Sequence, residues 1–242
     1  MTNFNNYGQR AKIGLAYPST GFVMEPEFYE MAPEGVITCT TRMLAKDVNA
    51  ENVAKFQDLT LDAAINLASA KVDLIVLGCT SGSFIQGSGF DQKIIEEMEA
   101  VSGGIPCTTT STAVIDALNR LKVKKIAVAT PYVEDINVMA KKFLNDHGFE
   151  IVSFKGQNML DDYEINSQSI DEIEKLIRKV DTKEAEAVAV LCTSMKGISI
   201  LSKLEKELGK PIITAIQATF WHCLRKLNIN DNISGYGCLL EK

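Results

Sequence analysis

The sequence has few histidines and no closely spaced pair of cysteines. Its two histidines, His147 and His222, give poor support for a metal site built on imidazole. The six cysteines contain no Cys-x-x-Cys motif, which argues against a zinc knuckle or a dithiol centre. The glycine-containing segment 82–89 lacks the Gly-Lys-Ser/Thr ending of a P-loop, which argues against a nucleotide site. The sequence therefore predicts no metal site.

The chain also lacks a long apolar run and an excess of positive charge. No apolar run reaches the ~18 residues of a membrane-spanning helix, and the first residues lack the apolar core of a signal peptide. Because 31 acidic side chains outnumber 25 basic ones, nothing in the charge favours nucleic acid or an anionic membrane as a partner. We expect a cytoplasmic enzyme with reduced cysteines that acts on a small molecule.

Short apolar strands alternate with helical patterns along the chain. The expected strands cover residues 10–17, 35–41, 72–78, 107–110, 124–130, 149–154, 186–191 and 209–213. The expected helices cover residues 50–70, 91–101, 112–121, 134–146, 169–180, 197–208 and 215–227. This alternation, with short turns, is typical of an α/β protein with mostly parallel sheets. The polar segment 156–167 is expected to be a loop, either a lid or an irregular connection.

The two halves of the sequence resemble each other. In each half an apolar strand runs into Cys-Thr-Ser, at Cys79 and again at Cys192. A helix, a short strand and a further helix follow in both halves. We therefore predict two similar Rossmann-like lobes related by pseudo-twofold symmetry, with the active site in the cleft between them. The predicted lobes are residues 1–112 together with 214–242, and residues 113–213.

Polar loops follow several of the expected strands. In open parallel sheets, ligands bind beyond the carboxyl ends of the strands. The residues at these ends are Pro18, Ser19, Thr20, Gly21, Cys79, Thr80, Ser81, Tyr132, Cys192, Thr193 and Ser194. We predict that they form one site for a small carboxylic acid, with the hydroxyl groups as donors.

Two opposed thiols have a specific chemical use. One thiolate can remove a proton or add to an activated carbon, while the other thiol donates a proton from the opposite face. A racemase or cis-trans isomerase that needs no cofactor works in this way. A free cysteine has a pKa near ~8.5, so nearby N–H and hydroxyl donors must stabilise the thiolate.

A plainer interpretation exists for each of these residues. A buried cysteine at a strand end is often only a small apolar side chain. The matching Thr-Ser after Cys79 and Cys192 favours catalysis for this pair. Tyr132 is either a substrate donor or the cap of a strand, and His222 is interpreted as a surface or satisfied histidine. The cysteines without this context, interpreted as packing residues, are Cys39, Cys107, Cys223 and Cys238.

At these residues the chain resembles the aspartate/glutamate racemase superfamily, and within it the branch of maleate cis-trans isomerases and arylmalonate decarboxylases. The motifs that carry the resemblance are Pro18-Ser19-Thr20-Gly21, Gly78-Cys79-Thr80-Ser81-Gly82, Pro106-Cys107-Thr108-Thr109, Ala129-Thr130-Pro131-Tyr132 and Leu191-Cys192-Thr193. Their order and spacing are specific, although each motif alone is short.

The resemblance implies two α/β domains, no cofactor and, as in many relatives, a possible homodimer. In isomerases of this branch, the cysteine matching Cys79 is the nucleophile toward the alkene, and the one matching Cys192 handles the proton. The decarboxylases keep only the cysteine matching Cys192. Gly21 departs from the isomerases, which carry an asparagine there that helps to bind a substrate carboxylate, and agrees with the decarboxylases. This departure leaves the substrate open.

Three hypotheses follow. The first is a cofactor-independent isomerase or racemase of a small carboxylate or dicarboxylate that uses both cysteines. The second is an arylmalonate-type decarboxylase in which Cys192 is the proton donor. The third is a protein that binds a small acid without catalysis.

Overall fold

The protein is built on two parallel sheets. A computed structural model describes residues 6–44 and 53–241, and in it each sheet has four strands. The strands of the first sheet, in the order β2-β1-β3-β4, are β1 Ala11–Pro18, β2 Val36–Met43, β3 Leu74–Leu77 and β4 Cys107–Thr109. The strands of the second, in the order β6-β5-β7-β8, are β5 Lys125–Thr130, β6 Glu150–Gly156, β7 Ala187–Val190 and β8 Ile212–Thr214.

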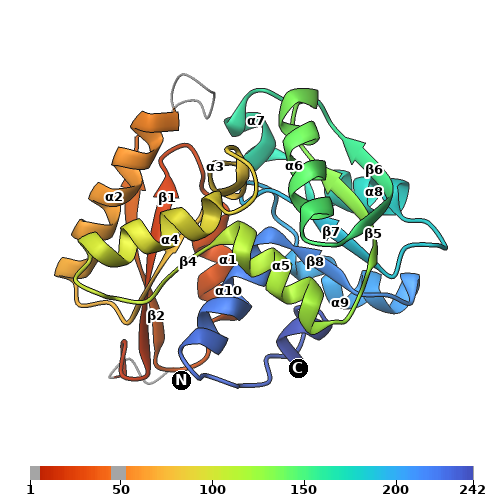
Figure 1. Ribbon diagram of the computed structural model, residues 1–242. Coiled ribbons are helices and arrows are strands. Elements are labelled where there is room, and N and C mark those ends of the chain that lie inside the picture. The colour runs from red at the N-terminus through yellow and green to blue at the C-terminus, as the bar shows by residue number, and fades with distance from the viewer. Residues whose placement is uncertain (1–5, 45–52, 242) are drawn as a thin grey trace.

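The strands follow one another in the same relative order in both sheets, which confirms the predicted α/β fold with two similar halves (Figure 1). β3 and β7 hold the same inner position in their sheets, and all four residues of each strand are buried. Strands of a parallel sheet that are covered on both faces need apolar residues at every position, and these two strands have them. The two Cys-Thr-Ser segments therefore leave equivalent places in the two sheets.

Helices cover the faces of both sheets. Their bounds are α1 Met24–Met31, α2 Val53–Ser69, α3 Thr80–Phe84, α4 Phe90–Val101, α5 Thr110–Arg120, α6 Glu134–Asp146, α7 Asp162–Ser167, α8 Ile170–Val180, α9 Ile198–Leu208 and α10 Ala215–Lys226, followed by the short 3-10 helix η2 Cys238–Glu241. In α8 the buried stripe of Ile173, Leu176, Ile177 and Val180 repeats at helical spacing and faces the second sheet. Within the described residues, no helix is long and apolar enough to cross a membrane.

Two helices at the centre of the molecule join the sheets (Figure 1). α5 follows the first sheet and α10 follows the second, yet they pack against each other. α10 also contacts α1 and β3 of the first half. The predicted lobe boundaries at 112/113 and 213/214 stay a prediction.

Three short helices differ from the elements expected from the sequence. α1 was not expected, α3 begins at Thr80 and extends into the glycine-containing segment 82–89, where no helix was expected, and α7 lies inside segment 156–167. Asp161 explains α7, since its side chain caps the helix by accepting a hydrogen bond from the Glu164 N–H at 3.0 Å. Tertiary contacts stabilise helices this short, which do not form in isolation. The helix expected over residues 50–70 starts at a residue that lies outside the described residues.

Candidate active site

Cys79 lies where β3 turns into α3. Its backbone is extended, its side chain is buried, and its Sγ atom is 4.0 Å from the Ser81 hydroxyl. Gly82 leaves room for the thiol, because a Cβ atom there would lie 3.0 Å from Sγ and would also meet the Phe56 ring. The local sequence therefore places a small, buried thiol at the carboxyl end of the strand.

Cys192 follows β7 in the corresponding place of the second sheet. Its backbone has φ = 153°, a value that residues other than glycine seldom adopt. The Ser194 N–H donates a hydrogen bond to its Sγ at 3.3 Å, and the side chain is buried. An unusual backbone at a polar, buried thiol is typical of functional sites, where surrounding contacts offset the local strain.

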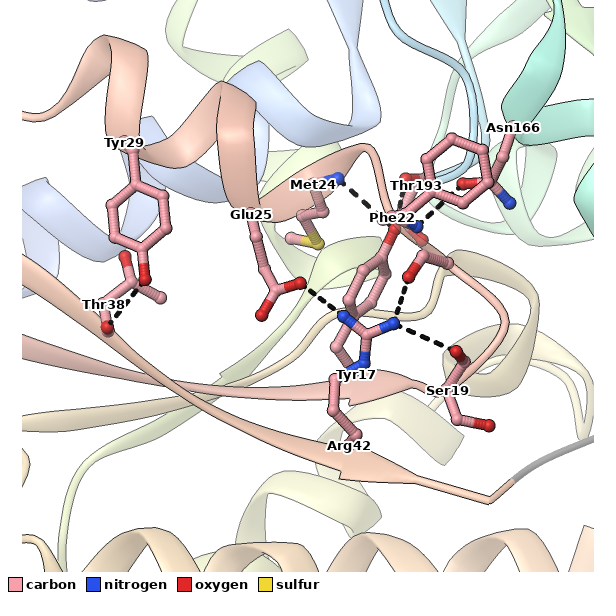
Figure 2. A network of polar contacts seen from close by, with 11 residues as sticks. Tyr17, Ser19, Phe22, Met24, Glu25, Tyr29, Thr38, Arg42, Asn166 and Thr193 are labelled. Atoms are coloured by element: carbon pink, nitrogen blue, oxygen red, sulfur yellow. Dashed lines mark hydrogen bonds and ion pairs between the residues drawn. The ribbon is translucent and has the colours of Figure 1, made fainter.

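Direct hydrogen bonds join the two Cys-Thr-Ser segments. The Thr193 hydroxyl donates to the carbonyl of Gly78, the residue before Cys79, at 3.1 Å. The Tyr17 hydroxyl, at the end of β1, donates to the Thr193 carbonyl at 3.1 Å (Figure 2). The carboxyl ends of β3 and β7 therefore meet, and the residues next to the two cysteines are in direct contact.

Tyr132 lies between the two segments. It follows β5, is buried, and interacts through its hydroxyl with both Cys192 and Thr80. Burial, followed by the nearby sulfur atoms of Cys192 and Cys79, raises the pKa of Tyr132 well above its ordinary value, so the phenol stays a donor. The Thr80 hydroxyl is buried as well and makes no hydrogen bond of ordinary geometry within the described residues.

Burial controls the protonation of both thiols. It raises the pKa of Cys79 to about 11 and that of Cys192 to about 12. Local donors act in the opposite direction: the Gly82 N–H and Ser81 at Cys79, and Ser194 and Tyr132 at Cys192. The expected donors are therefore present, but burial outweighs them, and both cysteines are thiols at neutral pH in the free protein.

The loop after β1 is held mainly through its backbone. The Ser19 N–H donates to the Met43 carbonyl at 2.7 Å, and Arg42 donates to the carbonyls of Ser19 and Gly21 while pairing with Glu25 (Figure 2). Pro18, Ser19 and Thr20 are half-buried, and Gly21 is buried.

Gly21 is required by the position of Tyr17. A Cβ atom at residue 21 would overlap the Cζ and hydroxyl atoms of Tyr17. The tyrosine hydroxyl therefore occupies the space that a larger residue at position 21 would need. The sequence pattern predicts Tyr17 only as part of a strand.

Two further polar residues of the site come from α7. The Ser194 hydroxyl donates to the Asp162 carboxylate at 2.7 Å. The buried Asn166 accepts a hydrogen bond from the Phe22 N–H at 3.1 Å, which ties α7 to the loop after β1 (Figure 2). Neither residue is among the predicted site residues, although the capping pattern from Asp161 to Glu164 indicates a helix there. No group of three or more His, Cys, Asp or Glu side chains in residues 6–44 and 53–241 is arranged to hold a metal ion.

The fold defines an α/β protein with an internal repeat, in which each half carries a buried thiol at the end of an equivalent strand. A sequence model of the arylmalonate decarboxylase family matches residues 13–240, and the chain belongs to this family.

Known relatives match along nearly the whole chain. A maleate isomerase from Pseudomonas putida is 25% identical over 245 residues, which cover 96% of this chain and 98% of the relative. The crystal structure of a cysteine-to-alanine variant of a Pseudomonas putida maleate isomerase, with maleate, has a TM-score of 0.91 at 24% identity and covers 96% of this chain and 97% of its own. A Nocardia farcinica maleate cis-trans isomerase with a covalently bound succinylcysteine intermediate has a TM-score of 0.90 at 22% identity and covers 96% and 98%.

Proposed function

We propose that this chain is a cofactor-independent isomerase of a small unsaturated carboxylic acid. The observation that carries the proposal is the hydrogen bond from Thr193 to Gly78, which joins the two segments, one from each sheet, that carry the buried thiols Cys79 and Cys192. The maleate isomerases among its relatives, and the succinylcysteine intermediate of one of them, support a reaction in which a cysteine adds to an alkene.

In the proposed mechanism each thiol has one role. Cys79 first loses its proton to solvent. Its thiolate then adds to one alkene carbon, and Cys192 donates its proton to the neighbouring carbon, which leaves a single bond free to rotate. After rotation the Cys192 thiolate removes a proton, the carbon–sulfur bond breaks, and the alkene and the Cys79 thiolate are restored. No net oxidation occurs, so the cycle needs no redox partner.

Donors around Cys79 would hold the substrate carboxylate. Thr80 has a buried hydroxyl without an ordinary hydrogen bond, and Tyr132 lies beside it. Ser81, Thr193 and the loop Pro18–Gly21 complete the proposed binding site. A buried, preorganised donor of this kind stabilises developing negative charge by about 3–4 kcal/mol at best.

The first prediction concerns the two cysteines. Cys79→Ala and Cys192→Ala should each lower kcat for maleate or a related cis acid by about 10²–10⁴-fold, which is the usual contribution of an acid–base group to the rate. Proton NMR in deuterated water would follow isomerisation and exchange together. Cys39→Ala, a half-buried cysteine on β2, is the matched control and should retain activity. Full activity of either site variant would contradict the two-thiol mechanism.

The runner-up is an arylmalonate-type decarboxylase, which the family and Gly21 favour. Release of carbon dioxide from a substituted malonate that survives Cys79→Gly would support it over the isomerase.

Thiol alkylation alone does not separate either enzyme from a protein that binds a small acid without catalysis, because burial keeps both thiols protonated in the free chain. A cytoplasmic location and a homodimer remain predictions, and sedimentation analysis tests the latter.

A further inference from the structure

A carboxylate lies within the proposed site. Asp162, the first residue of α7, is half-buried, and its carboxylate accepts a hydrogen bond from the Ser194 hydroxyl at 2.7 Å. The N–H of the same Ser194 donates to the Cys192 sulfur, so only one residue separates the carboxylate from that thiol. The negative charge of Asp162 also contributes to the raised pKa of Cys79, Cys192 and Tyr17. Asp162 is therefore close enough to interact electrostatically with groups from both halves of the protein.

No cation of the described residues neutralises this carboxylate. Asp162 takes part in none of the ion pairs found in residues 6–44 and 53–241. Arg42, whose guanidinium lies over the Tyr17 ring at 5.2 Å, pairs with Glu25 and binds loop carbonyls. Among the described residues, Asp162 is therefore a carboxylate near Cys192 that has no direct ion-pair partner.

This charge bears directly on the substrate. One carboxylate can bind at the donors near Cys79, where the Thr80 hydroxyl has no ordinary hydrogen bond. A second carboxylate at the other end of a dicarboxylate would then lie near Asp162, and two like charges in a partly buried site repel. An N–H group at that end would instead donate to the free lone pairs of Asp162.

We infer that Asp162 selects a monocarboxylate substrate whose far end carries an N–H donor, an amide or an ammonium group, in place of a second carboxylate. The inference rests on the proposed function and names the substrate class of that same site. Asp162 acts here as a specificity residue that binds the substrate and takes no part in the bond-making steps.

The experiment compares maleate with its monoamide, maleamate. The wild-type protein should isomerise maleamate with a kcat/KM at least tenfold above that for maleate. Asp162→Asn keeps an oxygen acceptor for Ser194 but removes the charge, so it should shift the ratio of the two kcat/KM values at least tenfold toward maleate. Asp161→Asn is the matched control, because asparagine also caps helices and Asp161 is exposed, and it should leave the ratio unchanged.

Calorimetry supplies a readout that does not depend on turnover. Succinamate, the saturated monoamide, should bind the wild-type protein at least tenfold more tightly than succinate. An ammonium analogue, 4-aminobutanoate, distinguishes a cationic donor from a neutral one. An active wild-type enzyme that prefers maleate, with a ratio unchanged by Asp162→Asn, would overturn the inference and leave the proposed function standing. If no unsaturated acid is turned over, the proposed function fails, and succinamate binding no tighter than succinate then overturns the inference as well.

Discussion

At the scale of single residues, the contact between Gly21 and Tyr17 shapes the edge of the site. The Tyr17 hydroxyl accepts a hydrogen bond from the Met24 N–H at 3.3 Å and donates one to the Thr193 carbonyl. It thus connects the start of α1 to the segment that carries Cys192. Only glycine at position 21 permits this arrangement, because any Cβ atom would overlap the tyrosine ring.

This contact leads to a prediction about stability. Gly21→Ala should displace Tyr17 and lower the free energy of unfolding by about 1–3 kcal/mol. Tyr17→Phe removes the same two hydrogen bonds directly and should cost about 1–2 kcal/mol. Since both changes break the same bonds, urea denaturation of the double variant should show a loss smaller than the sum by about 0.5 kcal/mol or more. Additive losses would show that Gly21 does not act through Tyr17.

At the scale of elements, α7 fastens the two halves together across the site. Asn166 accepts from the Phe22 N–H and donates to the Asp162 carbonyl at 2.6 Å, while the rings of Phe22 and Tyr163 lie 5.9 Å apart. The helix therefore holds Asp162 next to Ser194 and closes against the loop after β1. One of the two interpretations of segment 156–167, a lid, agrees with this position.

Removing the Asn166 side chain tests whether α7 positions the site. Asn166→Ala leaves the Phe22 N–H without its acceptor, which costs about 1–3 kcal/mol when the group stays buried. We expect faster amide hydrogen exchange over residues 160–168 and a KM that rises more than kcat falls. Glu164→Ala, on the exposed face of α7, should change neither quantity. A kcat loss with normal exchange would instead make Asn166 a residue of the chemical step.

At the scale of the whole molecule, a buried carboxyl group links the two halves. Glu27 on α1 accepts hydrogen bonds from the Gly197 N–H at 2.7 Å and the Ile198 N–H at 3.2 Å, at the start of α9. Burial raises the pKa of Glu27 to about 7, although these two N–H groups lower it. Its other oxygen, Oε2, has no partner among the described residues.

The raised pKa predicts a pH dependence of stability. The folded chain holds the Glu27 proton more tightly than the unfolded chain, so the stabilisation is fully present below about pH 4.5 and is lost as the pH rises through about 7. Glu27→Gln mimics the protonated acid. Relative to this variant, the wild type should lose on the order of 2–3 kcal/mol between those pH values.

Urea denaturation at pH 5 and pH 8 measures this difference. Glu164→Gln, at an exposed position, should follow the wild type at both values. A constant difference between wild type and Glu27→Gln across the range would mean that Glu27 does not titrate in the folded protein.

Much of this protein is determined by the sequence through local patterns. Apolar runs with turn residues after them identify β3 and β7, and the repeated Cys-Thr-Ser places Cys79 and Cys192 at equivalent strand ends. Because strands in α/β sheets point their carboxyl ends to one edge, the candidate thiols, Thr80 and Tyr132 could be found without coordinates.

Only the tertiary structure decided which other groups surround the thiols. Tyr17 meets Thr193, Phe22 meets Asn166, and Glu27 meets Gly197, pairs that lie more than a hundred residues apart in the chain. No local periodicity encodes such pairings, since they depend on how two complete sheets and the short helix α7 pack. The sequence by itself thus determined the parallel fold and the positions of the two thiols at strand ends. Only tertiary packing brought Asp162 next to Ser194, and with it the charge on which the inferred choice of substrate depends.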